Sequence, residues 1–252
     1  MQRRSPNAHP STPIIASRAC AVAIQGRHAL PPLSQEPTQR VRTCAGPSHM
    51  TCPVAPTRGA LHDLAERSRR RALLALPRMV PLAFYAAGLR RSQAFPGVQV
   101  PDFDPLDGGI GARVLFVLEK PGPGILPDGF VSRDNGTPTA AAIRAFMAQA
   151  GLPRGETVLW NLVPWWNGTT AVTAAERAAG LAELEALLPL LPALDTAVLV
   201  GRTAGAAREI LGGLRVLESA HPSPQVRAGF RDRWDEIPRV WTQAARPGAE
   251  PS

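Results

Sequence analysis

The run VLFVLEKPGPG occupies residues 114–124 and joins five apolar residues to a charged pair and a Pro/Gly turn. A buried parallel strand has this pattern when its last residue reaches the edge of a sheet. Glu119 and Lys120 then stand at that edge, where adjacent charges are costly unless they are paired or used in function. The run therefore predicts a strand over 113–118 and, at its end, the floor of a functional site.

Strand-like and helical segments alternate regularly after this strand. Apolar runs predict further strands at 157–163, 196–200 and 214–218. Cap residues and Pro/Gly stops predict the intervening helices, which are 137–150, 173–188, 203–211 (capped by Thr203) and 228–245 with a break at Pro238. The alternation predicts an α/β fold, a three-layer αβα sandwich with a central four-stranded parallel sheet.

Polar side chains stand at the ends of several of these strands. Glu119 and Lys120 end the first strand, Asn161 ends the second, and His221 follows the fourth. In open parallel sheets, the carboxyl ends of the strands meet at one edge, and ligands bind there. We therefore expect these side chains to lie together in one site.

His221 is the only histidine after His62, and the stiff segment Pro222-Ser223-Pro224 follows it. A neutral imidazole at the sheet edge can donate a hydrogen bond to negative charge that develops in a reaction. The alternative is that His221 fills a turn or caps a helix. Because the other polar groups converge on the same edge, we favour the functional interpretation.

Asn161 interrupts an otherwise apolar strand, so its amide needs a hydrogen-bond partner when buried. The side chain has two donors and one acceptor, which suit the edge of a pyrimidine base. Its alternative role is to bond the local turn. Phe130 stands in a polar loop and either anchors that loop to the core or stacks on a base, while Trp165 and Trp166 either do the same or cover the sheet edge.

The N-terminal 100 residues differ in character from the rest of the chain. They carry 14 arginines against three acidic residues, a net charge of +11, whereas residues 101–252 carry 14 basic and 17 acidic residues, a net charge of −3. Segment 1–57 lacks hydrophobic periodicity and is predicted to be disordered, with a basic DNA-tethering arm as the alternative. Segment 58–100 is predicted to be a helical lead-in, with a helix over 59–76 that carries arginines 69–71 on its solvated side or against phosphates. Residues 246–252 are expected to be a disordered tail.

Cysteine usage and hydropathy exclude several classes of protein. The three cysteines, Cys20, Cys44 and Cys52, are odd in number and fit no metal-binding spacing. The acidic segment 102–109 lacks the closing Glu of a calcium loop. The sequence has no apolar run long enough for a membrane span. We therefore expect a cytoplasmic protein without a metal or other cofactor.

Several of these segments together resemble the uracil-DNA glycosylase superfamily over about residues 112–241. The most specific match is His221-Pro222-Ser223-Pro224 followed by Arg227 and Gly229-Phe230, and Leu118-Glu119-Lys120-Pro121-Gly122 is similar to another motif of the family. The resemblance implies a flavodoxin-like αβα sandwich and a monomer that removes uracil or a related deaminated base from DNA in base excision repair. Four cysteines hold an iron–sulfur cluster in some branches, and this chain lacks them in the matching region, so it resembles a divergent member without a cluster.

The resemblance also implies roles for individual residues. Glu119 would act on water or on the cationic sugar, and His221 would stabilise the leaving base. The base would stack on Phe130 and be read by Asn161, with Lys120 beside it. The DNA backbone would be held by Pro121, Gly122, Ser223, Pro224 and Arg227.

Lys120 is the main departure from the family, because many members place Asp or Asn there to handle water. It can pair with Glu119, contact a phosphate, or attack the sugar to give lyase activity. The departure also keeps open a second function, that of a glycosylase-like DNA-binding protein with little or no catalysis. A nucleotide-binding enzyme of another kind is disfavoured, because neither GxGxxG nor a P-loop follows any predicted strand.

Overall fold

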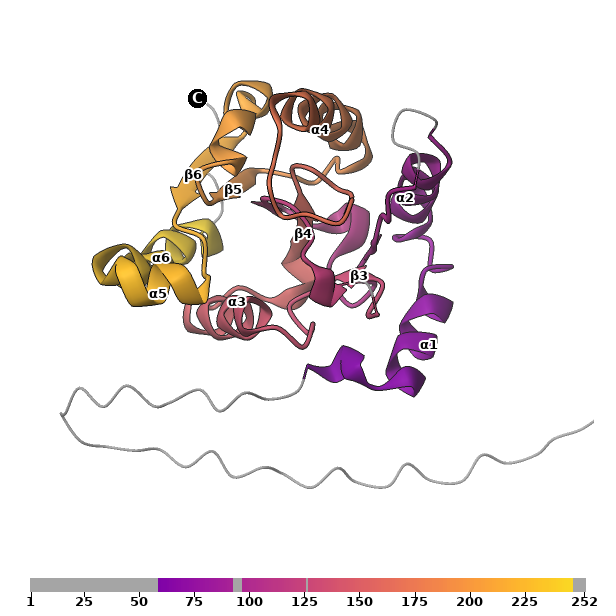
Figure 1. Ribbon diagram of the computed structural model, residues 1–252, viewed down its shortest axis with the longest axis horizontal. Coiled ribbons are helices and arrows are strands. Elements are labelled where there is room, and N and C mark those ends of the chain that lie inside the picture. Colours follow the sequence, from indigo (N-terminus) through magenta and orange to yellow (C-terminus); the bar gives the residue numbers. More distant parts are fainter. Residues whose placement is uncertain (1–58, 93–96, 126, 247–252) are drawn as a thin grey trace, which may run out of the picture. The chain divides into compact units, whose positions relative to one another are not determined.

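A parallel sheet of four strands forms the centre of the protein (Figure 1). The computed structural model describes residues 59–92, 97–125 and 127–246. The segment 1–57 that the sequence predicts to be disordered lies outside these residues, as do its cysteines and all but the first residue of the predicted tail. None of the helices that the structure describes has the length and apolar character needed to cross a membrane.

The order of strands in the central sheet is β4-β2-β5-β6, and each neighbouring pair is parallel. Leu118 pairs with Asn161, and Val200 pairs with Ser219, so the carboxyl ends of the strands reach the same edge. The predicted α/β fold is thereby confirmed. The strands are β2 (Val114–Leu118), β4 (Thr157–Asn161), β5 (Thr196–Val200) and β6 (Arg215–Ser219).

Helices cover both faces of this sheet and form the outer layers of the sandwich. The α-helices of the described residues are α1 (Leu64–Leu73), α2 (Val80–Arg91), α3 (Pro138–Gln149), α4 (Ala174–Leu187), α5 (Pro224–Gly229) and α6 (Arg231–Ala245). Short 3-10 turns accompany them at η1 (Ala60–His62), η2 (Gly109–Gly111), η3 (Pro123–Ile125), η4 (Arg154–Glu156), η5 (Leu188–Leu190), η6 (Ala204–Ala207) and η7 (Glu209–Leu211).

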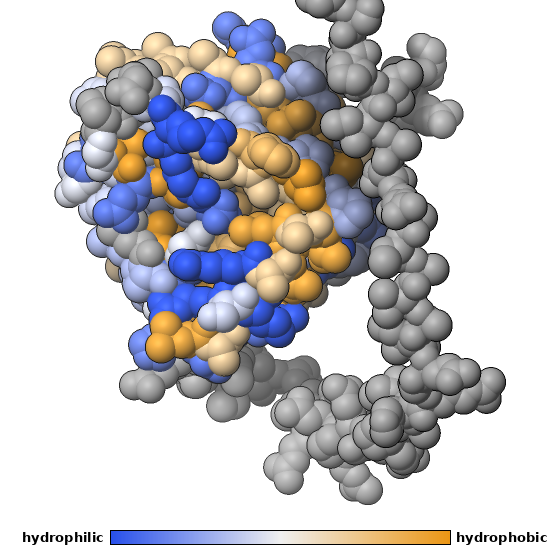
Figure 2. Space-filling view, turned by 90° about the vertical axis from the view of Figure 1, so that its right-hand side faces the viewer, coloured by the Kyte–Doolittle hydropathy of each residue, from blue (hydrophilic) through white to orange (hydrophobic). Residues whose placement is uncertain are grey.

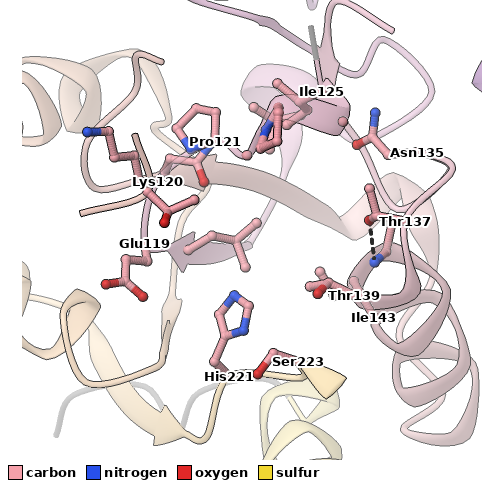
Figure 3. Close-up of a pocket in the computed structure, with 18 of the residues that line it drawn as sticks. Glu119, Lys120, Pro121, Ile125, Asn135, Thr137, Thr139, Ile143, His221 and Ser223 are labelled. Atoms are coloured by element: carbon pink, nitrogen blue, oxygen red, sulfur yellow. Dashed lines mark hydrogen bonds between the residues drawn. The ribbon is translucent and has the colours of Figure 1, made fainter. Parts of the chain in front are cut away.

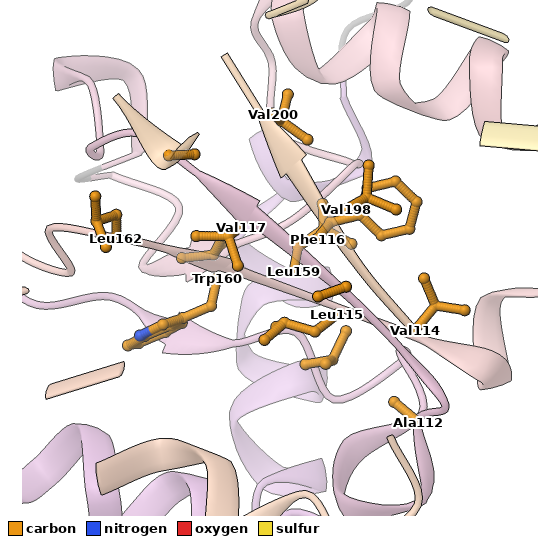
Figure 4. Packing of buried hydrophobic residues seen from close by; sticks show 14 of the residues in the cluster. Ala112, Val114, Leu115, Phe116, Val117, Leu159, Trp160, Leu162, Val198 and Val200 are labelled. Atoms are coloured by element: carbon orange, nitrogen blue, oxygen red, sulfur yellow. The ribbon is translucent and has the colours of Figure 1, made fainter. Parts of the chain in front are cut away.

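The strands are apolar along their whole length because both faces of the sheet are packed. On one face Trp241 of α6 meets Phe116, with ring centroids 4.9 Å apart. On the other face Trp160 stacks on Phe103 at 3.7 Å. Figure 4 shows Phe116 on one side of the sheet and Trp160 with Leu115 on the other. This two-sided burial fixes the sheet and therefore the positions of its polar strand ends.

The helices α3 and α4 begin at the caps that the sequence predicts. The side chain of Thr137 accepts a hydrogen bond from the backbone N–H of Ala140. Thr173 and Glu176 form the predicted capping box at the start of α4. The sequence alone could locate these helix starts, because each cap satisfies backbone groups within one turn of its helix.

The prediction for residues 203–211 is wrong in one respect that matters for function. Residues 204–211 form the short turns η6 and η7 instead of one helix, and Thr203 caps neither. Its hydroxyl donates a hydrogen bond to the carboxylate of Glu119. Glycines at 205, 212 and 213 weaken a longer helix here, because glycine loses more backbone entropy than other residues.

The C-terminal helix also breaks at a different residue from the predicted one. Pro238 lies inside α6, and the break falls at Phe230, between α5 and α6. The backbone of Phe230 has φ −141° and ψ 63°, outside the helical region, which turns the chain between the two helices. Pro238 is buried within α6, as are Ile237, Trp241 and Ala244.

The N-terminal lead-in contributes α1 and α2, and α2 buries Leu82, Ala86 and Leu89 in the core; Figure 2 faces the side of the molecule that carries these two helices. In the predicted helix 59–76, α1 begins only after Asp63, whose side chain accepts a hydrogen bond from the N–H of Ala65. Pro81 lies in the first turn of α2, where its missing N–H costs nothing. The strands β1 (Asp102–Phe103) and β3 (Phe130–Val131) pair in parallel and are too short for a sequence pattern to reveal.

A buried ionic network joins α1 to the loop after β3, and it corrects the prediction of a solvated face at Arg70 alone, because Arg69 and Arg71 are exposed as predicted. Arg70 is buried, and its guanidinium bonds the carboxylates of Asp104 and Asp134. Arg154 bonds the same two carboxylates from η4. Burial raises the pKa of the neighbouring Asp107 to about 7. Buried carboxylates need counter-charges, and this need draws Arg70 inward.

Candidate active site

A cavity of about 590 Å³ opens at the carboxyl edge of the central sheet. Glu119, Asn161 and His221 all line it, so the structure brings together three of the side chains that the sequence places at this edge. Figure 3 shows Glu119 next to His221 at one side of the cavity, with Ile125, Thr139 and Ile143 around the remainder. The other polar residues of the lining are Lys120, Ser132, Asn135, Thr137, Thr170, Ser223 and Gln225.

Glu119 is held at the cavity by contacts from two neighbouring strands. Its backbone carbonyl accepts a hydrogen bond of 3.0 Å from the N–H of Val163, just after β4. Its carboxylate accepts the hydroxyl hydrogen of Thr203, which follows β5. Because Glu119 is hydrogen-bonded at both its backbone and its side chain, its carboxylate has a defined direction, which a group acting on a substrate requires.

His221 stands on the loop after β6, directly against Gly201. A side chain at position 201 would place its Cβ 3.2 Å from the Cβ of His221, and Gly201 has φ +92°, so this position favours glycine twice over. Burial lowers the pKa of His221, and the nearby Glu119 carboxylate opposes this shift without reversing it. Within the described part of the chain, no hydrogen bond occupies either ring nitrogen. A neutral imidazole with a free N–H therefore faces the cavity.

Asn161 is only 2% exposed at the end of β4. Its amide nitrogen Nδ2 is buried and has no hydrogen-bond partner among the described residues. An unsatisfied buried donor typically costs about 1–3 kcal/mol, so such groups are rare without a purpose. The local-turn alternative leaves Nδ2 unexplained, whereas a ligand in the cavity would satisfy it.

Lys120 has its ammonium group outside the cavity, although the residue contributes to the lining. Nζ donates to Asn167 Oδ1 at 2.8 Å, to the carbonyl of Ala171 at 3.0 Å and to Glu176 Oε1 at 2.7 Å. Figure 3 shows the ammonium pointing away from His221. An ammonium group has three N–H donors, and all three are used. The geometry therefore does not support the predicted base-binding role of Lys120, nor its pairing with Glu119.

The ion pair of Lys120 and Glu176 fixes the segment between β4 and α4. The Lys120 side chain is 1% exposed. Burial alone would raise the pKa of Glu176, but the hydrogen bonds from Lys120 and from the backbone of Thr173 hold it below its usual value. The same carboxylate also accepts from Asn167 Nδ2 at 3.0 Å. Thr170, on this segment, lines the cavity, so the ion pair shapes one cavity wall.

Phe130 has no exposed surface and is not part of the cavity lining. Its neighbour on β3, Val131, lines the cavity instead. Successive residues of a strand point to opposite sides, so only one of the two can face the cavity. The structure thus places Phe130 as an anchor of its loop, the alternative to the predicted stacking plate.

Asn135 is a cavity residue that the sequence did not single out. Its Nδ2 donates to Asp128 Oδ2 at 2.8 Å and to the carbonyl of Phe130 at 3.1 Å, and its Oδ1 accepts from the N–H of Ser132 at 2.9 Å. The side chain thereby organises the loop that carries Val131 into the cavity wall. The only signal in the sequence was an amide within the turn-rich run 128–136.

The predicted backbone contacts lie around the mouth of the cavity, with one exception. Pro121, Gly122 and Ser223 line the cavity, and the side chain of Ser223 caps α5 by accepting from the N–H of Val226. Pro224 begins α5. Arg227 is exposed outside the lining, with its guanidinium 5.7 Å from the ring centroid of Trp234.

The two tryptophans after β4 do not line the cavity. Trp165 is buried in the core. Trp166 exchanges backbone hydrogen bonds with Gln99, at 2.8 and 2.9 Å. Of the two roles that the sequence left open for them, the structure supports covering the sheet.

The part of the chain that forms this cavity also resembles known proteins. The sequence matches the model of the uracil DNA glycosylase superfamily over residues 107–245, more than half of the chain. No protein with a curated description matches it. One similar solved structure is the wild-type UNG of Nitratifractor salsuginis, with 15% identity, a TM-score of 0.42 and coverage of 74% of this chain and 98% of that chain. Another is a candidate uracil DNA glycosylase of Methanosarcina acetivorans, with 16% identity, a TM-score of 0.42 and coverage of 56% of this chain and 94% of that chain. Since the family model covers more than half of the chain, the chain belongs to the uracil DNA glycosylase superfamily.

Proposed function

We propose that this protein is a DNA glycosylase that hydrolyses the N-glycosidic bond of uracil or a related deaminated base in DNA, as a step of base excision repair. The observation that carries the proposal is the buried amide nitrogen of Asn161, which has no hydrogen-bond partner among the described residues and lies in a cavity wall that also holds His221 and Glu119. We further propose that the protein acts as a monomer in the cytoplasm.

Base recognition is the first step of the proposed reaction. The target nucleotide leaves the base stack, at a cost of a few kcal/mol, and its base enters the cavity. A cavity of about 590 Å³ has the usual size of a small-molecule site. Asn161 Nδ2 then donates to a carbonyl oxygen of the base, which removes the cost of the unsatisfied donor.

Departure of the base places negative charge on its ring, and His221 is the group that meets it. Burial lowers the pKa of His221 and so favours the neutral imidazole, which still carries one N–H that can donate a hydrogen bond to the base. A well-placed donor to a developing anion contributes about 3 kcal/mol in comparable sites. The bond between the base and C1′ of the sugar breaks with its electron pair going to the base.

Glu119 acts on the other product of bond cleavage, the cationic sugar. Its carboxylate stabilises the positive charge and accepts a proton from the water molecule whose oxygen attacks C1′. Thr203 holds this carboxylate through its hydroxyl. The products are the free base and an abasic site.

A second candidate function is binding of DNA without turnover. The observation that favours it is Lys120, which stands where many members of the family place an Asp or Asn to handle water and whose ammonium group bonds Asn167, Ala171 and Glu176. Only Glu119 is then left to act on water.

One experiment separates the two candidates. The full chain is incubated with single- and double-stranded oligonucleotides that contain uracil, hypoxanthine or xanthine, and abasic sites are then cleaved with alkali. We expect cleavage that His221→Ala reduces by about 100-fold or more, that Asn161→Ala also reduces, and that the exposed control His62→Ala leaves unchanged. Binding without abasic product supports the second candidate, and neither binding nor cleavage contradicts both.

A further inference from the structure

A second cavity, of about 400 Å³, lies beside the first at the ends of β5 and β6, and the proposed reaction does not use it. Arg202 and Arg233 line it, together with Glu218 and Glu236. Its lining includes Gly201 and Ala220, so the two cavities adjoin at His221.

Arg233 connects this cavity to an exposed aromatic ring. Its guanidinium lies 5.5 Å from the ring centroid of Phe230, which is 57% exposed between α5 and α6. Phe230 occupies the N-cap position of α6 without a side-chain cap hydrogen bond. Ser, Thr, Asp or Asn at that position would stabilise the helix by about 1 kcal/mol. The chain thus keeps a phenylalanine where both exposure and helix capping disfavour it.

The exposed ring lies within a few nucleotides of the first cavity. Ser223 lines that cavity and caps α5, and Phe230 follows the six residues of this helix. At 1.5 Å per residue, α5 is about 9 Å long. Bases of one strand are spaced about 3.4 Å apart when stacked and farther apart when extended. A strand with one nucleotide in the cavity therefore reaches Phe230 with a neighbouring base.

The charges on this surface favour a polyanion moderately. Arg202, Arg227 and Arg233 have no carboxylate within ion-pair distance among the described residues. Arg231 is neutralised by Asp235 at 3.0 Å. Asp232 and Glu236 offset part of the remaining positive charge. Stacking on the aromatic ring must then supply a large share of the affinity.

We propose that Phe230 and Arg233 form a stacking platform for an unpaired base of the DNA strand that carries the target nucleotide, and that Arg202 contacts a phosphate of the same strand in the second cavity. Aromatic rings stack on any base, because every base has a π face. The ring faces of paired bases in a duplex are covered, so the platform selects single-stranded DNA. This inference rests on the proposed function for the identity of the strand.

The test measures binding separately from base removal. A fluorescein-labelled single strand without uracil is titrated with the full chain, and anisotropy gives the dissociation constant. We expect Phe230→Ala to weaken binding about tenfold, Phe230→Trp to restore it, and Arg202→Gln to lower the salt dependence by about 0.7 in slope. Phe84→Ala on α2 is the matched control, because Phe84 is also exposed, at 70%, and lies far from α5 and α6 (Figure 1).

The outcomes distinguish this inference from the proposed function. Equal effects of Phe230→Ala and Phe84→Ala overturn the platform, even if uracil is removed normally. Binding that depends on Phe230, without removal of any base, supports the platform and overturns the proposed reaction. Absence of single-strand binding by the wild-type chain overturns the platform, as does tight duplex binding that Phe230→Ala leaves unchanged.

Discussion

The hydroxyl of Thr203 donates a hydrogen bond to the carboxylate of Glu119 across 84 positions of sequence. This contact joins the ends of β5 and β2 and orients the group that the proposed reaction uses at the sugar. Thr203→Ala removes the donor, and hydrogen bonds to charged groups contribute about 1.5–3 kcal/mol. We expect single-turnover excision to slow about tenfold or more, and Thr203→Ser to restore it.

The control for this change is Thr242→Ala, because the Thr242 hydroxyl bonds only its own helix, at the carbonyl of Pro238. It should leave the rate unchanged. A rate that Thr203→Ala does not alter would show that Glu119 needs no orientation by β5.

The titration of His221 should be displaced toward acid. Burial lowers its folded-state pKa, so the unfolded chain binds its proton more tightly than the folded chain does. The imidazole is then neutral and the folded state favoured above the unfolded value of about 6.5. The contribution of His221 to stability should decline as the pH falls below that value, and excision should decline only at the lower pKa of the folded state. NMR titration of the imidazole measures the pKa directly.

Glu119→Gln tests whether the charge of Glu119 affects the pKa of His221. The carboxylate opposes the effect of burial, so its removal should move the pKa of His221 still lower. A rise in that pKa would mean that Glu119 does not act on His221 by its charge.

Lys120 should matter for stability through its buried ion pair. Removing one partner of such a pair typically costs about 3–5 kcal/mol, so Lys120→Met should lower the free energy of unfolding by about 3 kcal/mol, measured with urea. Borohydride should trap no DNA adduct on Lys120, because its three donors are engaged.

The exposed pair of Arg208 and Glu218 is the matched comparison, with side chains 56% and 50% exposed. Arg208→Met should cost less than about 1 kcal/mol. Equal losses in the two variants would contradict a structural role for the buried pair, and a trapped adduct would return Lys120 to the chemistry.

Phe130 should behave as a core residue and not as a base-stacking residue. Its side chain is fully buried, so Phe130→Leu should lower the free energy of unfolding by about 1–2 kcal/mol. The KM for excision should change little. Val131→Ala alters the cavity wall directly and should change KM more. A large rise in KM with Phe130→Leu alone would show that the ring reaches the base after all.

Much of the fold follows from local patterns in the sequence. Apolar runs with both faces buried mark the strands, and cap residues mark α3 and α4. The topology then places the polar residues at the strand ends together, because the carboxyl ends of parallel strands meet at one edge of the sheet. Glu119, Asn161 and His221 could be placed together for this reason alone, without knowledge of a single contact.

The features that the sequence did not reveal depend on distant partners or on very short elements. Lys120 pairs with Glu176, which is 56 positions away, and the sequence around Glu176 indicates only a capping box. Burial of Arg70 depends on carboxylates from two other segments. In a two-residue strand such as β3, a shift of one residue exchanges the faces, so Phe130 and Val131 could not be distinguished.

The ionic network of Arg70 has a consequence for where an independently folding fragment can begin. The region that matches the family starts at residue 107, yet Arg70 on α1 supplies positive charge to buried Asp104 and Asp134. A fragment cut at residue 101 would keep these acids and lose Arg70. The smallest autonomous folding unit therefore extends upstream of the family region, at least through α1, and truncation studies of this protein should retain that helix.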